Sequence, residues 1–129
     1  MVKVAVNIVT FNSGEDIAAC LESLGRQTFR DFRIHVLDNA STDGTINALS
    51  RFDLDLIRSQ SNTGFARAHN DLIRSYPAEF ALVLNPDAVL MPEFLERIVG
   101  ALESQGGGPK PRSLRRDRAG RCADLEGDV

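Results

Sequence analysis

The chain has 129 residues, of which 43% are hydrophobic and 26% charged, so it is long enough for one domain with a core and is neither fibrous nor disordered throughout. Its formal net charge of −3 provides no overall basic surface, and nucleic-acid binding is therefore not expected. No apolar run is long enough for a signal peptide or a membrane span, which indicates a cytoplasmic protein.

The first part of the chain predicts a buried strand followed by a helix. The β-branched run Val4 to Val9 is typical of the strand, and the turn and cap residues 10–14 end it. Apolar residues then recur at helical spacing up to Gly25, which is a stop signal. Cys20 lies at one of these apolar positions, so a buried free thiol is expected there rather than a metal or disulfide site.

The same alternation continues up to Ser104. The predicted strands cover residues 32–37, 54–57 and 80–84, and the predicted helices cover residues 45–51, 65–75 and 93–103, with Pro92 in the first turn of the last helix. Apolar strands that alternate with helices predict a mainly parallel sheet with helices on both faces, a Rossmann-like α/β domain over residues 1–104. Glycines, prolines and six basic residues predict a weakly ordered basic extension over residues 105–129.

Ligands of such sheets bind beyond the carboxyl ends of the strands, so the loops at 10–14, 38–44 and 85–87 should converge on one crevice. These loops could bind a nucleoside-diphosphate sugar. Phe11 could form an apolar wall beside the base, Asp38 could accept a hydrogen bond from a ring N–H, and Asp87 could hold a divalent ion. Mg²⁺ and Mn²⁺ are often held by one or two carboxylates together with substrate phosphates, so one aspartate is sufficient.

Each of these residues also has a structural explanation. Asp87 stands in an Asn-Pro-Asp sequence that suits a turn or a helix cap. Asp38 and Asn39 can simply end a strand, and Phe11 can pack within its loop. Both histidines are expected to be structural. The combination, rather than any single residue, favours a binding site.

Four segments form an ordered set of motifs. They are Val6–Asn12 (VNIVTFN), Val36–Thr45 (VLDNASTDGT), Asn62–Asn70 (NTGFARAHN) and Leu84–Asp87 (LNPD). In this order and spacing they resemble the donor-binding half of family 2 glycosyltransferases of the GT-A fold, and most nearly the rhamnosyltransferase-like branch. The resemblance covers residues 3 to about 103.

The resemblance implies a set of donor-binding residues. They are Thr10, Phe11, Asn12, Asp38, Asn39, Gly64, Phe65, Asn85 and Asp87, with Asn62 and Asn70 helping to shape the loop and helix beside the donor. Asp87 matches the last acid of the family's Asp-X-Asp motif, the residue expected to meet Mg²⁺ or Mn²⁺. Asn85 replaces the first acid of that motif, which implies a weaker metal site.

The resemblance further implies an inverting transfer from a dTDP-rhamnose-like or UDP-sugar donor to a glycan or lipid-linked acceptor, in the synthesis of bacterial cell-surface polysaccharide. No residue of the chain matches the family's catalytic base, so the catalytic residue is unknown. The chain is expected to be the donor half of a longer enzyme, truncated or naturally fragmentary and inactive alone.

Further expectations concern location and partners. The resemblance is compatible with a position at the inner membrane face and with a homodimer. The alternative is a nucleotide-binding or interaction module without transfer activity. A dinucleotide oxidoreductase is disfavoured, because the loop after the first strand lacks the Gly-x-Gly-x-x-Gly fingerprint.

Overall fold

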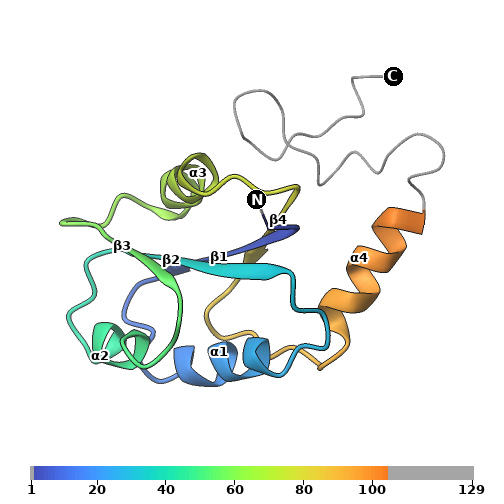
Figure 1. The fold of residues 1–129 in the computed structure, drawn as a ribbon. Helices are drawn as coiled ribbons and strands as arrows, with labels where there is room; N and C mark the ends of the chain where they lie inside the picture. Colours follow the sequence, from blue (N-terminus) through green and yellow to red (C-terminus); the bar gives the residue numbers. More distant parts are fainter. Residues whose placement is uncertain (1, 105–129) are drawn as a thin grey trace.

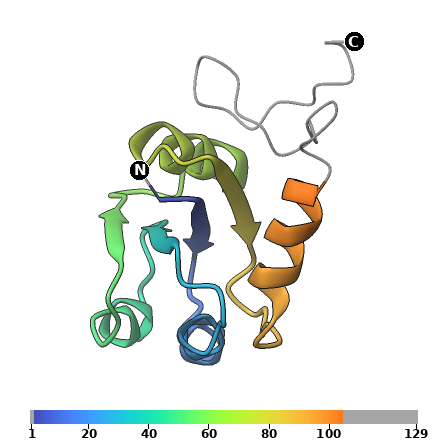
Figure 2. The ribbon, with the colours of Figure 1, turned by 45° about the vertical axis from the view of Figure 1, so that its right-hand side comes forward.

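The computed structural model describes residues 2–104, in which four strands form one parallel sheet in the order β3-β2-β1-β4 (Figure 2). The elements in chain order are β1 (Val4–Thr10), α1 (Ile17–Gly25), β2 (Phe32–Asp38), α2 (Thr45–Leu49), β3 (Asp55–Arg58), α3 (Phe65–Ser75), β4 (Phe80–Leu84) and α4 (Phe94–Ser104). The predicted Rossmann-like α/β fold is confirmed. The predicted extension over 105–129 lies outside the described residues.

Helices cover both faces of the sheet, with α1 and α2 on one side and α3 on the other (Figure 1). Successive residues of a strand point to opposite faces, so β1 contributes to two cores. Val6 and Ile8 belong to the larger core, with residues of α1, α2 and α4. Val9 packs in the smaller core with Leu72 of α3. Ile8 is fully buried, and burial of such a side chain contributes roughly 1.5–3 kcal/mol.

The element boundaries differ from the predicted ones by one or two residues, and α3 and β4 agree with the prediction. Helix α2 ends at Leu49, where the N–H of Phe52 donates to the Leu49 carbonyl in a turn. Helix α4 begins at Phe94, so the expected place of Pro92 in its first turn is wrong. Pro92 precedes the helix, and its carbonyl accepts a hydrogen bond from the Thr28 N–H at 2.9 Å.

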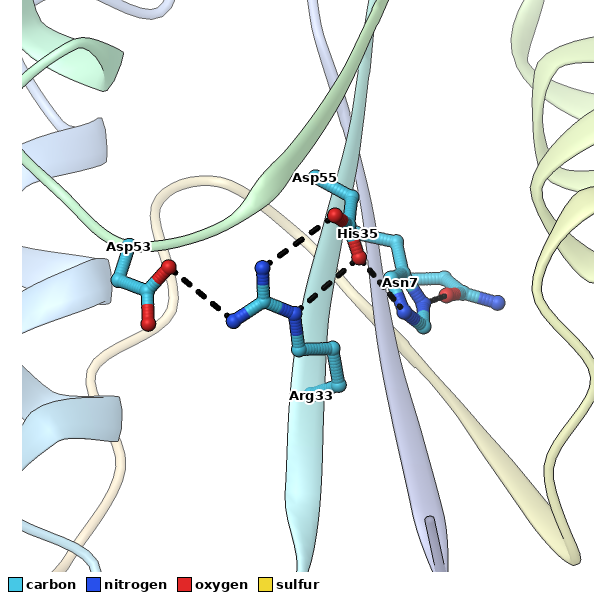
Figure 3. A network of polar contacts seen from close by, with 5 residues as sticks. All are labelled: Asn7, Arg33, His35, Asp53 and Asp55. Atoms are coloured by element: carbon cyan, nitrogen blue, oxygen red, sulfur yellow. Dashed lines mark hydrogen bonds and ion pairs between the residues drawn. The ribbon is translucent and has the colours of Figure 1, made fainter. Parts of the chain in front are cut away.

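A polar network joins β1, β2 and the start of β3 (Figure 3). Arg33 lies between two carboxylates, with Nη1 3.1 Å from Asp53 Oδ1 and Nε 3.2 Å from Asp55 Oδ2. The ring of His35 lies between Asn7 and Asp55, with Nδ1 3.0 Å from Asn7 Oδ1 and Nε2 3.5 Å from Asp55 Oδ2. Both ring nitrogens of His35 therefore face partners inside the chain, which supports the structural role predicted for this histidine.

Candidate functional site

The loops that follow β1, β2 and β4 leave the sheet at the same edge. Thr10 is paired with Asp38 at the ends of β1 and β2, and Ile8 is paired with Leu84 at the end of β4. All three strands run in the same direction, so the segments that follow them lie together at their carboxyl ends. The structure therefore brings together the three loops that the sequence predicted to converge.

Asp38 is the centre of a buried cluster at this edge. Its Oδ1 accepts hydrogen bonds from the hydroxyls of Thr10 at 2.7 Å and Ser41 at 2.6 Å, and its Oδ2 accepts one from the Ser41 N–H at 2.9 Å. The side chain is only 2% exposed, and a buried charge needs such donors. A carboxylate has about four acceptor positions, so about one remains for a ligand.

Asn39 links the end of β1 to the loop before α3. Its N–H donates to the Thr10 carbonyl at 2.8 Å, its Nδ2 donates to the Gly64 carbonyl at 3.3 Å, and its Oδ1 accepts from the Thr63 N–H at 3.2 Å. Gly64 has φ +88°, a conformation in which an L side chain is strained. These bonds place Phe65, which is 57% exposed, at the start of α3 on the same edge of the sheet.

The loops after β1 and β2 are also bonded to each other. The N–H of Asn12 donates to Ser41 Oγ at 2.8 Å, and the N–H of Thr42 donates to Asn12 Oδ1 at 2.9 Å. Asn12 and Ala40 have φ values of 48° and 62°, in the left-handed region, which costs non-glycine residues of order 1–3 kcal/mol. The bonds offset this strain and hold Phe11, 51% exposed, at the surface.

Asn85 and Asp87 lie exposed in the turn after β4, which the Ala88 N–H closes by donating to the Asn85 carbonyl at 3.0 Å. Within residues 2–104, the Asp87 carboxylate takes part in no hydrogen bond or ion pair. Burial, together with the negative charge of Asp87, raises the pKa of the Cys20 thiol to about 11. A free carboxylate in an exposed turn fits a metal that is shared with substrate phosphates.

The described residues contain no group of three or more His, Cys, Asp or Glu side chains that could hold an ion. An ion at Asp87 would therefore need oxygen ligands from a substrate or from water. Asn85, beside Asp87, offers an amide oxygen instead of a second carboxylate.

The nine predicted site residues divide into two groups. Thr10, Asp38 and Asn39 are buried and bonded within the chain, whereas Phe11, Asn12, Gly64, Phe65, Asn85 and Asp87 are exposed. A cavity of about 390 Å³ beside α4 is lined by none of them, but by Met91, Glu93, Phe94, Arg97 and Ile98. We place the candidate site at the carboxyl edge of the sheet, because the polar groups gather there.

Sequence reasoning missed Ser41, which donates two of the three hydrogen bonds to Asp38, and also missed Ser23 and Gln27 of the first helix and the loop after it. Ser23 and Gln27 had a signal. Ser23 follows Cys20 at helical spacing on the apolar face of α1, and Gln27 comes just after the helix; both are polar side chains that need a partner when they are buried.

Residues 5–108 match the profile of glycosyl transferase family 2. The chain belongs to this family. An uncharacterized glycosyltransferase of Haemophilus influenzae is 28% identical over 100 residues, which are 77% of this chain and 34% of the relative. The poly(ribitol-phosphate) β-N-acetylglucosaminyltransferase TarS of Staphylococcus aureus is 31% identical over 103 residues, 74% of this chain and 18% of TarS.

Solved structures show the same fold for this family 2 chain. The crystal structure of a TarS fragment in complex with UDP-GlcNAc has a TM-score of 0.76 at 24% identity, and the match covers 86% of this chain and 37% of that one. The mannosyltransferase PcManGT of Pyrobaculum calidifontis, in complex with GDP-Man and Mn²⁺, has a TM-score of 0.64 at 28% identity, covering 68% and 28% of the two chains. The chain thus spans about a third of the length of the first relatives.

The predicted membership of family 2 is confirmed, whereas the rhamnosyltransferase-like branch is not. The relatives named above include an N-acetylglucosaminyltransferase and a mannosyltransferase.

Among residues 2–104, no helix has the length and apolar character needed to cross a bilayer.

Proposed function

We propose that this family 2 chain binds a nucleoside-diphosphate sugar together with Mg²⁺ or Mn²⁺, as the donor half of an inverting glycosyltransferase. One observation carries the proposal: the buried Asp38 cluster, two exposed aromatic rings and the Asp87 carboxylate, which has no hydrogen bond or ion pair within residues 2–104, lie at one edge of a parallel sheet. A nucleotide base needs a flat apolar face, the base and ribose need hydrogen-bonding groups, and the anionic diphosphate needs a bound cation, which a carboxylate can hold.

The residues of the site have distinct proposed roles. Asp38 accepts a hydrogen bond from the base, and Phe11 forms an apolar wall beside it. The buried side chains of Thr10 and Asn39 hold the loops in place, while Asn12, Gly64 and Phe65 shape the surface next to the donor. Asp87, beside Asn85, holds the divalent ion. Such an ion, when bound, stabilises the negative charge that develops on the departing diphosphate.

The donor is proposed to be a UDP-sugar, since TarS is crystallised with UDP-GlcNAc, and a dTDP-rhamnose-like donor is the second candidate. The acceptor is proposed to be a glycan or a lipid-linked glycan in bacterial cell-surface polysaccharide synthesis, in the cytoplasm or at the inner membrane face. Donor binding is assigned to residues 1–104 and a connecting role to residues 105–129. The catalytic base is proposed to lie outside the described residues. A homodimer stays a prediction.

Thermal unfolding of the full chain with UDP, with and without Mn²⁺, tests the metal assignment. A ligand at 100 times its Kd stabilises the folded state by about 2.7 kcal/mol, which raises the Tm of a domain of this size by roughly 10 °C or more. Asp87→Ala should abolish the part of the Tm increase that depends on Mn²⁺. Glu22→Ala, which removes an exposed carboxylate on α1, is the control and should behave as wild type.

Two outcomes would contradict the proposal. An unchanged Mn²⁺ effect in Asp87→Ala would remove Asp87 from the metal site. The absence of any shift with uridine, thymidine and guanosine diphosphates would remove the donor-binding function itself. The same panel ranks the candidate donor bases.

The second candidate is a module that binds nucleotide without transferring sugar. It predicts the same thermal shifts, so binding alone does not distinguish the two. Release of free nucleoside diphosphate from a nucleotide sugar, measured with an acceptor glycan present, does. Binding without release would favour the module.

A further inference from the structure

Helix α1 and the turn after it carry a buried polar row toward the segment that links β4 to α4. Cys20 and Ser23 are fully buried, and Gln27 is 2% exposed. Cys20 and Ser23 lie one turn apart on α1, and Gln27 follows the end of the helix. Burying polar groups is costly unless they are hydrogen-bonded, so the partners of this row show what it holds.

The partners of Cys20 and Ser23 lie on the linking segment, residues 85–93. The Sγ of Cys20 is 3.8 Å from the Asn85 carbonyl oxygen, within the distance of a weak hydrogen bond to sulfur. The Leu90 N–H donates to Ser23 Oγ at 3.1 Å, and that hydroxyl in turn donates to the Cys20 carbonyl at 2.7 Å. The linking segment is therefore attached to α1 on both sides of Asp87.

Gln27 makes the most extensive attachment. Its Nε2 donates to the Met91 carbonyl at 2.8 Å and to the Ser23 carbonyl at 3.2 Å, and its Oε1 accepts from the Leu95 N–H at 3.0 Å. Leu95 lies in the first turn of α4, where backbone N–H groups have no partner within the helix. Gln27 thus satisfies the start of α4 and fixes the linking segment at the same time.

The linking segment is held by apolar packing as well as by polar contacts, since Ala88 and Leu90 pack against the larger core. Val89 is 62% exposed and Met91 is 72% exposed, and Asp87 is exposed as well. The polar contacts of this segment and of the start of α4 with α1 and the turn after it use backbone groups of the segment. Ser23 and Gln27 make three of these contacts, and the Pro92 carbonyl also accepts from the Thr28 N–H at 2.9 Å. Ser23 and Gln27 therefore help to set the position of the Asp87 turn relative to the other loops of the site.

We propose that Gln27, supported by Ser23, is a positioning residue for the metal turn, because it fixes the linking segment that carries Asp87 at the same edge of the sheet as the Asp38 cluster. Neither residue touches the donor or the ion. The inference rests on the proposed function for its consequence in binding, but the attachment itself is tested separately.

The binding test uses Gln27→Met in the full chain. Methionine has a similar length and no amide, so the three hydrogen bonds are lost while the volume is kept. Loss of groups that orient metal ligands lowers metal affinity by about 10–100-fold. We expect the Mn²⁺-dependent gain in UDP affinity, measured by calorimetry, to fall at least about tenfold, with metal-free UDP affinity unchanged.

Val99→Ala is the matched control. Val99 is 4% exposed and lies on α4, the helix whose first turn is bonded to Gln27. Its truncation weakens the packing of α4 and leaves the hydrogen bonds of Gln27 in place. It should lower the Tm and leave both UDP affinities unchanged. A merely structural role for Gln27 would make Gln27→Met behave in the same way, and that outcome overturns the proposal.

Amide hydrogen exchange tests the attachment without any ligand. In Gln27→Met the N–H groups of Ala88, Leu90 and Leu95 should exchange faster, while that of Val6 in β1 stays as slow as in wild type. Wild-type exchange at Ala88 and Leu90 overturns the proposal. Ser23→Ala, which removes the acceptor of Leu90, serves as the second variant if Gln27→Met does not fold. If wild type binds no nucleoside diphosphate, the proposed function fails, and exchange still decides the attachment.

Discussion

Replacing Asp38 by asparagine keeps the shape of the side chain but removes the charge at the centre of the site. The Ser41 N–H can only donate, so the amide oxygen must stay beside it, and the new NH₂ group faces the hydroxyls of Thr10 and Ser41. Those hydroxyls can turn and accept, so no partner is lost. Each of the three hydrogen bonds becomes a neutral one, however.

The expected cost follows from that change. A hydrogen bond to a charged group contributes about 1.5–3 kcal/mol and a neutral one about 0.5–1.5, so three changed bonds cost about 3 kcal/mol. Relief of the buried charge offsets part of this, which leaves a loss of about 2 kcal/mol in the free energy of unfolding. The Tm should fall by roughly 8–16 °C.

Urea unfolding of Asp38→Asn, Ser41→Ala and the double variant measures this cost. Ser41→Ala removes one of the hydroxyls that face the carboxylate, so the two changes should be coupled by about 1 kcal/mol. A loss below about 0.5 kcal/mol in Asp38→Asn, or strictly additive effects, would refute the assignment of Asp38 as the centre of the cluster.

Three further predictions concern buried or paired titratable groups. His69 has no hydrogen bond to its ring nitrogens within the described residues, and burial lowers its pKa from 6.5 to about 4. Between these two pH values only the unfolded chain takes up the proton. The free energy of unfolding should therefore decline as the pH drops from 6.5 toward 4. His69→Leu should remove this decline in urea titrations at several pH values. The hydrogen bond from Arg33 lowers the pKa of Asp55, so the stability it contributes is complete above the ordinary carboxyl pKa and is lost as the pH falls through the lowered one. Asp55→Asn should make the free energy of unfolding depend less steeply on pH in the acid range. The effect is small, because solvent screens this partly exposed pair. An unchanged pH dependence would contradict the prediction. Burial raises the pKa of the Cys20 thiol, and the thiolate is the form that reacts. In a Cys122→Ser background, Cys20 should therefore resist iodoacetamide at pH 8 until urea unfolds the protein. Fast labelling of the folded protein would contradict this prediction.

The fold could be predicted because its signals are local. The β-branched run of β1 and the turn residues after it fix that strand within a few positions, and strand-helix alternation implies parallel pairing. The strand order β3-β2-β1-β4 was not predicted, since it depends on contacts between distant segments. The early end of α2 likewise depends on a turn bond from Phe52 rather than on helical periodicity.

The site could be predicted only at the level of loops. The sequence placed Thr10, Asp38 and Asn39 at strand ends, but not their bonds to one another and to Gly64, which join positions up to 29 residues apart. No local pattern encodes such pairs. Gln27 shows the same limit, because its partner Leu95 lies 68 residues further along the chain.

The division between buried and exposed site residues separates two effects that mutations usually mix. Asp38 and Asn39 are buried and hydrogen-bonded within the chain, so changing them alters the stability of the fold and the shape of the site together. Asp87 and Phe65 are exposed, and the Asp87 carboxylate has no hydrogen bond or ion pair within residues 2–104. Replacement of Asp87 should therefore alter ligand binding with little effect on the free energy of unfolding. A carboxylate that the fold does not use for its own stability is free to take a metal and a phosphate as partners, which is why the loss at Asp87 should appear only when both ligands are present.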